Sequence, residues 1–317
     1  MREKTMSLSQ MIGTALGLGA MLVASAGLQA QAPVGEVRPA AAGARPPSGP
    51  GAFCNAPCDP YPGKKKLLVI ADVQTGYQHA AINHTMAVIE QLGRKTGKFV
   101  TFLRTDSQIV TKSPITVKSV RYARGNINAR NLDYFDAVFF LGSGEGTMSD
   151  QQKADLLAFV RDDGKGIVLG HAQGVNFYNW PEWGTMIGGF MASEYPPAGM
   201  WAKVVDPSWK SAAAFGRKSF FWADQWPVLT PEFTKGGVHT IISLDPAKMT
   251  PEQMTRASRT DNYLPIVWAK SYGKGRVFNM TGGHNETTLD DPKTQALILE
   301  GIEWALGLRT EDTTPDK

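Results

Sequence analysis

The stretch Gly166-Ile-Val-Leu-Gly-His-Ala-Gln-Gly174 joins an apolar run directly to a turn of small residues that carries one histidine. A continuous run of Val, Ile and Leu is typical of a buried parallel strand, and Gly-x-nucleophile-x-Gly is the strand-to-helix elbow of many α/β enzymes. The nucleophile position of this elbow holds Ala172, whose methyl side chain cannot attack a substrate. The stretch therefore predicts an α/β fold whose chemistry depends on other residues.

Apolar runs on the N-terminal side of the elbow predict three more strands, at Lys66–Asp72, Phe99–Leu103 and Ala137–Leu141. Between the first two, apolar residues recur with helical spacing. They are Ile82, Met86, Ile89 and Leu92. Because strands alternate with helices, we expect an α/β fold with a mostly parallel sheet. The polar and basic residues 107–132 allow no assignment.

A glycine-rich loop, Gly142-Ser-Gly-Glu-Gly146, follows the strand predicted at Ala137–Leu141. Backbone N–H groups in such a loop can hold an anion. The spacing lacks the third glycine of a dinucleotide fingerprint and the lysine of a P-loop, so it indicates a nucleotide site only weakly. The next helix is predicted to begin at Ser149-x-x-Gln152, which fits a capping box.

The C-terminal part of the core predicts a hairpin and one last helix. Leu264–Trp268 and Arg276–Met280 form the two strands of the hairpin. The helix is bracketed by Asp291 as N-cap, by Pro292 at its first position and by Gly307 just beyond its last turn.

Residues 1–30 are predicted to form a secretory signal peptide. Arg2 and Lys4 supply the basic segment, Met11–Val23 the apolar segment, and cleavage is expected after Ala30. The apolar run is shorter than the roughly 20 residues that a membrane span needs, which favours a cleaved peptide over a retained anchor. We therefore expect export to the periplasm or the medium, with no membrane attachment after cleavage.

Residues 31–63 are rich in Pro, Ala and Gly and are predicted to form a flexible linker. The linker holds both cysteines, Cys54 and Cys58, and an exported location favours a disulfide between them over two free thiols. Residues 64–308 then form one α/β domain, and 309–317 a polar tail.

The formal net charge of +4 is spread over the chain without a basic stripe. The one basic cluster, Lys64-Lys-Lys66, stands at a strand entrance. Nucleic acid is therefore not expected as a partner. The oligomeric state stays open.

Three of the five histidines follow predicted strands: His79, His171 and His284. Ligands of open parallel sheets bind at the carboxyl ends of the strands, so we expect these side chains to lie together. His84 falls in a helix and His239 just before a strand. Tryptophans gather in the middle third of the chain, among them Trp180 and Trp226, where they either stack on a sugar or fill the packing.

Short motifs in a fixed order resemble the ThuA-like, or trehalose-utilisation, family. The motifs are Tyr77-Gln-His79, Gly170-His-Ala172, Tyr178-x-Trp-Pro-Glu182, Pro265-x-x-Trp268, Gly273-Lys-Gly-Arg-Val-Phe278 and Gly283-His284. The resemblance implies a three-layer α/β/α sandwich, flavodoxin-like, as in class I glutamine amidotransferases. That superfamily has a Cys at the elbow and a His-x-Glu pair after the last strand.

This sequence matches the pair with His284-Asn-Glu286 but has Ala172 at the Cys position. Glutamine hydrolysis through a thiolate is therefore excluded. Two family features, a His-Pro and an Asp-Glu, are replaced here by Tyr195-Pro196 and Asp224-Gln225.

The leading hypothesis is an enzyme of disaccharide or keto-sugar utilisation, as the resemblance implies, acting on a small carbohydrate without a cofactor. His171 and His284 would be acid and base, and Glu286 would orient His284. The other residues expected to bind substrate are His79, Tyr178, Trp180, Glu145, Asp224 and Trp226.

Two alternatives stay open. In the first, His79, His171 and His284 bind Zn²⁺ or another divalent metal ion and leave one position for water or sugar oxygens. In the second, the chain is a non-catalytic protein that binds a sugar or a partner on the same fold.

Overall fold

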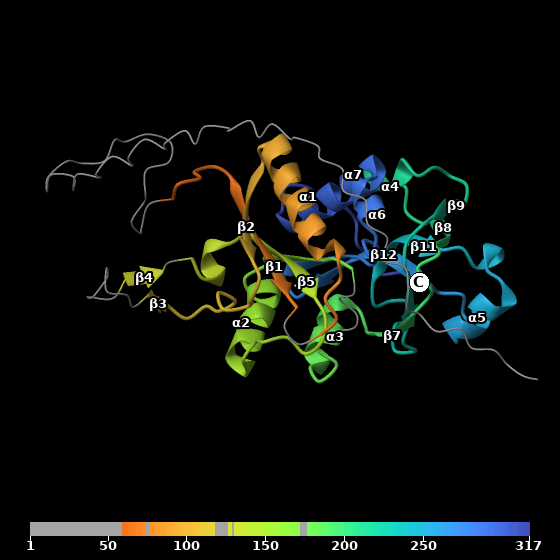
Figure 1. Cartoon of the computed structure of the whole chain (residues 1–317), viewed down its shortest axis with the longest axis horizontal. Coiled ribbons are helices and arrows are strands. Elements are labelled where there is room, and N and C mark those ends of the chain that lie inside the picture. The colour runs from red at the N-terminus through yellow and green to blue at the C-terminus, as the bar shows by residue number, and fades with distance from the viewer. Residues whose placement is uncertain (1–58, 74–75, 118–125, 129, 172–175) are drawn as a thin grey trace, which may run out of the picture. The chain divides into compact units, whose positions relative to one another are not determined.

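The computed structural model describes residues 59–317 except 74–75, 118–125, 129 and 172–175 (Figure 1). The predicted signal peptide, most of the predicted linker and both cysteines lie outside the described residues, as does Ala172. None of the helices in the described part is both long and apolar enough to cross a membrane.

The largest element is a nine-stranded sheet with the strand order β2-β1-β5-β6-β13-β12-β11-β8-β9. Its strands are β1 (Lys65–Asp72), β2 (Phe99–Arg104), β5 (Ala137–Gly142), β6 (Gly166–Leu169), β8 (Met200–Val204), β9 (Phe220–Trp222), β11 (His239–Leu244), β12 (Pro265–Tyr272) and β13 (Gly275–Met280). The strands predicted near the N-terminus, at the elbow and in the hairpin are all present.

The two halves of this sheet differ in direction. β2, β1, β5, β6 and β13 are parallel neighbours, whereas β12, β11, β8 and β9 continue the sheet with antiparallel pairs. The predicted α/β class with a large, mostly parallel sheet is confirmed. The antiparallel extension begins with the predicted hairpin of β12 and β13, and its continuation through β11, β8 and β9 was not predicted. The three-layer, flavodoxin-like arrangement stays a prediction.

Helices lie on both faces of the sheet (Figure 1). They are α1 (Ala81–Thr96), α2 (Asp150–Arg161), α3 (Pro181–Ile187), α4 (Lys210–Ala213), α5 (Pro251–Ala257), α6 (Glu286–Asp290) and α7 (Pro292–Ala305). Alternate residues of β1 explain this: Leu67 and Val69 pack in one core with α1 and α7, and Leu68 and Ile70 in a second core with α2 and α3. A strand buried on both faces is apolar throughout, as the sequence shows.

Predicted helix ends agree with the structure. Ser149 and Gln152 form the capping box of α2, and Asp291 accepts the Thr294 N–H as the N-cap of α7. The unassigned residues 107–132 include a small hairpin of β3 (Ile115–Val117) and β4 (Asn126–Asn128).

A second small sheet pairs β7 (Met191–Glu194) with β10 (Pro227–Leu229). Both strands come from the middle third of the chain, which is rich in loops. The last residue of β7, Glu194, brings its carboxylate close to His171.

Candidate functional site

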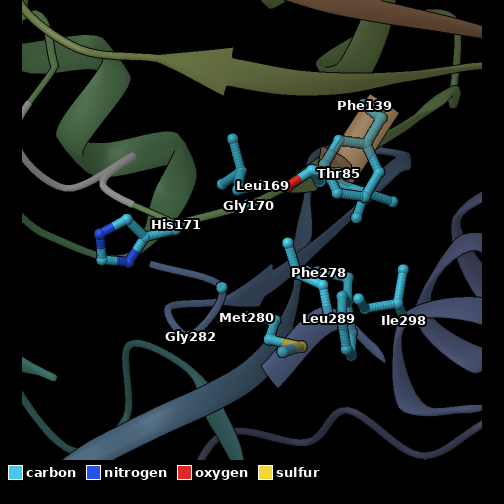
Figure 2. Close-up of a pocket in the computed structure, with 12 residues that line it drawn as sticks. Thr85, Phe139, Leu169, Gly170, His171, Phe278, Met280, Gly282, Leu289 and Ile298 are labelled. Atoms are coloured by element: carbon cyan, nitrogen blue, oxygen red, sulfur yellow. The ribbon is translucent and has the colours of Figure 1, made fainter. Parts of the chain in front are cut away.

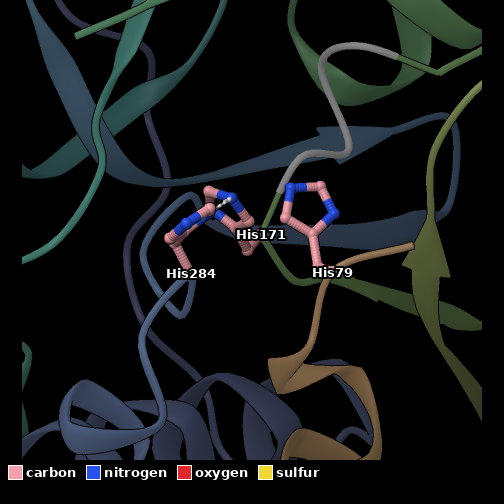
Figure 3. Close-up of side chains that lie close together, drawn as sticks. All are labelled: His79, His171 and His284. Atoms are coloured by element: carbon pink, nitrogen blue, oxygen red, sulfur yellow. Dashed lines mark hydrogen bonds between the residues drawn. The ribbon is translucent and has the colours of Figure 1, made fainter. Parts of the chain in front are cut away.

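Three loops at the carboxyl edge of the parallel strands carry the candidate site. His79 lies in the loop between β1 and α1, His171 follows β6, and His284 follows β13. Parallel strands end at the same edge, and the structure brings the three imidazoles together there (Figure 3). The predicted convergence of these histidines is therefore confirmed.

The three imidazoles are close enough to share one ligand. One ring nitrogen of each histidine lies within 4.8 Å of a ring nitrogen of the others. His284 Nδ1 lies 3.2 Å from His171 Nε2, and the rings of His79 and His171 meet edge to face with centroids 4.8 Å apart (Figure 3).

Two glycines allow this approach. A Cβ on Gly170 would lie 2.5 Å from Leu141 Cδ2 and 3.1 Å from Phe139 Cε1, so a larger residue would require these β5 side chains to move. Gly283 has a φ of 111°, a conformation that other residues rarely adopt, and it turns the chain toward the site just before His284.

His171 has a defined tautomer. Its Nδ1 lies 2.7 Å from the carbonyl oxygen of Thr281, which can only accept a hydrogen bond. Nδ1 therefore carries a proton, and Nε2 directs its lone pair toward the other two histidines. Metal-binding histidines commonly show this arrangement, in which the outer N–H donates to a backbone carbonyl.

Burial keeps two of the imidazoles neutral. It lowers the pKa of His79 to about 4, helped by the charges of His171 and His284. The side chain of His171 is 7 % exposed, and burial lowers its pKa to about 4 against the opposing effect of the Thr281 carbonyl. Neutral imidazole is the form that binds metal ions and accepts protons.

Asp224 holds the loop that carries His284. Its carboxylate is fully buried and accepts hydrogen bonds from the N–H groups of Gly283 at 2.7 Å, His284 at 3.1 Å and Gln225 at 2.7 Å. Burial raises the pKa of Asp224, although these backbone donors oppose the shift. Asp224 was predicted to bind substrate, and in the structure its oxygens accept hydrogen bonds from backbone N–H groups.

Glu194 is a site residue that the sequence analysis did not find. It ends β7, and its Oε1 lies 3.9 Å from His171 Nε2. Burial raises the pKa of Glu194, and the charge of His284 partly offsets this shift. The neighbouring Tyr195 stands where the ThuA-like family often has a histidine. The residues around Glu194 carry no motif that predicts its place beside the parallel strands.

The predicted partner of His284 lies elsewhere. Glu286 is exposed in the first turn of α6, and within the described residues no hydrogen bond or ion pair joins it to His284. Glu145 is partly exposed in the loop after β5, and no such contact between it and the three histidines is found in the described part.

The predicted aromatic residues are mostly packing groups. Trp180 and Trp226, predicted to bind substrate, are buried: Trp180 stacks on Trp183, and Trp226 packs against Trp222. Tyr178 is half-exposed, and its hydroxyl donates to the Met191 carbonyl at 2.6 Å.

The floor of the site is apolar. A cavity of about 10 Å³ lies behind His171, lined by side chains such as Phe139, Phe278 and Ile298 (Figure 2). This is about the space of one water molecule, but an apolar lining offers water too few partners. His171 therefore has apolar surroundings on that side.

The chain belongs to the ThuA family: the family model described as trehalose utilisation matches residues 66–305. The predicted family is thereby confirmed, and membership suggests a role in carbohydrate utilisation. None of the curated proteins matches the chain.

Two solved structures share the fold. A ThuA-like protein from Bacteroides uniformis is 17 % identical with a TM-score of 0.57, over 77 % of this chain and 91 % of that one. A ThuA-like protein from Parabacteroides merdae is 15 % identical with a TM-score of 0.53, over 78 % and 92 %. At these identities the likeness shows the fold alone.

Proposed function

We propose that this protein is a carbohydrate-active enzyme whose reaction centre is a divalent metal ion, such as Zn²⁺, held by His79, His171 and His284. The observation that carries the proposal is the approach of one nitrogen from each imidazole to within 4.8 Å of the others.

The shortest distance in the cluster fits metal ligands. Two nitrogens bound to a tetrahedral Zn²⁺ at about 2.0–2.1 Å are about 3.3 Å apart. His284 Nδ1 and His171 Nε2 are 3.2 Å apart. The hydrogen bond from His171 to the Thr281 carbonyl gives that ligand the outer partner it needs.

Three protein ligands leave a coordination position open, as in catalytic rather than structural zinc sites. His79, His171 and His284 would hold the metal ion, and the ion would supply a Lewis acid for a carbonyl or hydroxyl oxygen, which would suit hydrolysis or isomerisation of an oxidised sugar. The ThuA family supports a carbohydrate such as a disaccharide as substrate. Ala172 leaves no thiolate for glutamine hydrolysis.

A second candidate is metal-free acid and base catalysis by His171 and His284. The contact of 3.2 Å between their nitrogens favours it, because one ring can pass a proton to the other. Carbohydrates remain the substrate class in this case.

Both candidates would act outside the cytoplasm. The basic and apolar pattern of residues 1–30 supports export. N-terminal sequencing of the protein from separated cell fractions tests this, and a retained Met1 would contradict it.

The first experiment measures metal content and Zn²⁺ affinity of the purified chain, together with turnover of trehalose and its singly oxidised keto forms. We expect one Zn²⁺ per chain. His171→Ala should weaken Zn²⁺ binding by on the order of 10²-fold or more, since even outer-shell partners of metal ligands contribute 10–100-fold. His84→Ala is the matched control, because His84 lies on α1 and pairs with Asp290.

The outcomes separate the hypotheses. A chain that binds no Zn²⁺ but loses turnover in His171→Ala supports acid and base catalysis. A chain that binds a sugar without turning it over, with affinity unchanged in His171→Asn, is a binding protein.

A further inference from the structure

One carboxylate faces the three histidines from outside the parallel strands. Glu194 Oε1 lies 3.9 Å from His171 Nε2, and the side chain is 25 % exposed. Within the described part of the chain, no other Asp or Glu oxygen lies within 4.0 Å of a nitrogen of His79, His171 or His284.

The backbone around Glu194 is fixed from two sides. Tyr195 N–H donates to the Trp226 carbonyl at 2.9 Å, continuing the pairing of β7 with β10. The Arg256 guanidinium donates to the Glu194 carbonyl at 2.5 Å. These contacts hold the backbone at the end of β7 in place, so the Glu194 side chain begins from a fixed position beside His171.

The Glu194 carboxylate keeps its acceptors for a ligand. Among the described residues, its side-chain oxygens receive no hydrogen bond, and the neutral imidazole of His171 lies beside them. A separation of 3.9 Å is too long for a direct hydrogen bond. It leaves room for one oxygen atom between the carboxylate and the imidazoles.

The other nearby carboxylates cannot take this place. Asp224 is occupied by three backbone N–H groups, and Glu286 is exposed on α6. Glu194 therefore combines proximity to the histidines with unused oxygens, which neither of the other two does.

We propose that Glu194 is a catalytic residue that takes a proton from a water molecule or sugar hydroxyl held among the three imidazoles. The O–H bond breaks, its proton bonds to a Glu194 oxygen, and the electron pair stays on the oxygen of the ligand, which becomes the nucleophile or alkoxide. This role rests on the proposed function, since the histidine centre must hold the reacting oxygen.

The test compares Glu194→Gln with the matched control Glu232→Gln, an exposed carboxylate in the loop after β10, using Zn²⁺ affinity and turnover of the keto forms of trehalose. Gln has the shape of Glu but cannot accept the proton, so kcat should fall by on the order of 10²-fold or more. Zn²⁺ affinity should change by less than about threefold, because Glu194 is not a metal ligand in this proposal. Glu232→Gln should leave both values unchanged.

Unchanged kcat in Glu194→Gln overturns the proposal, and so does a joint loss of kcat and Zn²⁺ affinity, which would make Glu194 a ligand. Failure of the proposed function looks different, because the natural chain would then bind no Zn²⁺ or would turn over no sugar.

A crystal structure of the Zn²⁺-loaded chain tests the same point without turnover. A Glu194 oxygen should lie about 2.6–3.2 Å from the solvent oxygen at the open position. A carboxylate that points away from this oxygen, or that binds Zn²⁺ directly, would overturn the proposal.

Discussion

Asp224 determines where His284 lies, although it acts through the backbone. Its two oxygens accept the N–H groups of Gly283 and His284, so the turn after β13 is tied to the loop before β10. Charge-assisted bonds of this kind are stronger than neutral ones. The imidazole position therefore depends on a carboxylate that is fully buried.

Asp224→Asn should lower the free energy of unfolding by about 2–4 kcal/mol, because a buried acceptor is replaced by an NH₂ group that faces backbone N–H donors. Zn²⁺ affinity should fall as well, since His284 loses its anchor. Urea denaturation and zinc titration measure the two effects. Asp290→Asn is the control, because Asp290 is exposed and should change stability by less than about 1 kcal/mol. Equal losses of unfolding free energy and Zn²⁺ affinity in Asp224→Asn and Asp290→Asn would contradict the role of Asp224 in holding His284.

The last helix shows how closely an element can be fitted to the sheet. Gly301 lies inside α7, where glycine is unfavourable for a helix by about 1 kcal/mol relative to alanine. A Cβ at this position would lie 2.4 Å from ring atoms of Phe278 on β13. The glycine is therefore required by the packing of α7 against β13.

Gly301→Ala should destabilise the protein by about 1–3 kcal/mol, although helix propensity alone predicts a gain, because the methyl group forces Phe278 out of place. Urea denaturation measures this. Combining it with Phe278→Leu should recover part of the loss, since the two positions are in contact and their effects are not additive. A more stable Gly301→Ala variant would show that Phe278 moves freely.

At the level of the whole molecule, the C-terminal tail is part of the fold. The Asp316 carboxylate bonds to the hydroxyl groups of Thr240 and Tyr263, and Arg309 pairs with the buried Glu300 at 2.6 Å. The tail predicted at 309–317 from its polar composition is thus held against β11 and α7. Polar residues dock here because each meets an opposite charge or a hydroxyl group.

His239 links this docking to pH. It lies 2.8 Å from the Asp206 carboxylate and 2.8 Å from the Thr314 carbonyl. Burial alone would lower its pKa, but these two partners outweigh burial and raise the pKa above 6.5.

A raised pKa means that folding favours the protonated imidazole, so its stabilisation is complete below about pH 6.5 and is lost as pH rises through the folded-state pKa. The difference in unfolding free energy between the natural chain and His239→Gln should therefore shrink from pH 5.5 to 8.5 by urea denaturation. In an Asp206→Asn background the difference should become nearly independent of pH. A difference that grows with pH would contradict the assigned direction.

The features that the sequence predicts correctly depend on residues that are close together along the chain. The apolar runs, the caps at Ser149 and Asp291 and the position of each histidine after a strand are set by neighbouring residues. Because parallel strands end at the same edge of a sheet, the sequence predicted that His79, His171 and His284 lie close together. The family followed from motifs that are likewise short.

The tertiary structure decided what depends on residues far apart in sequence. The sequence pointed to Glu286 because it is close to His284 along the chain, whereas the folded chain places Glu194 by His171 through the pairing of β7 with β10. Trp180 and Trp226 are of a residue type that stacks on sugar rings, but in the folded chain both are buried in the core. The sequence therefore determined the parallel strands and the approach of the three histidines to one another. Long-range packing determined the position of the Glu194 carboxylate and the burial of Trp180 and Trp226.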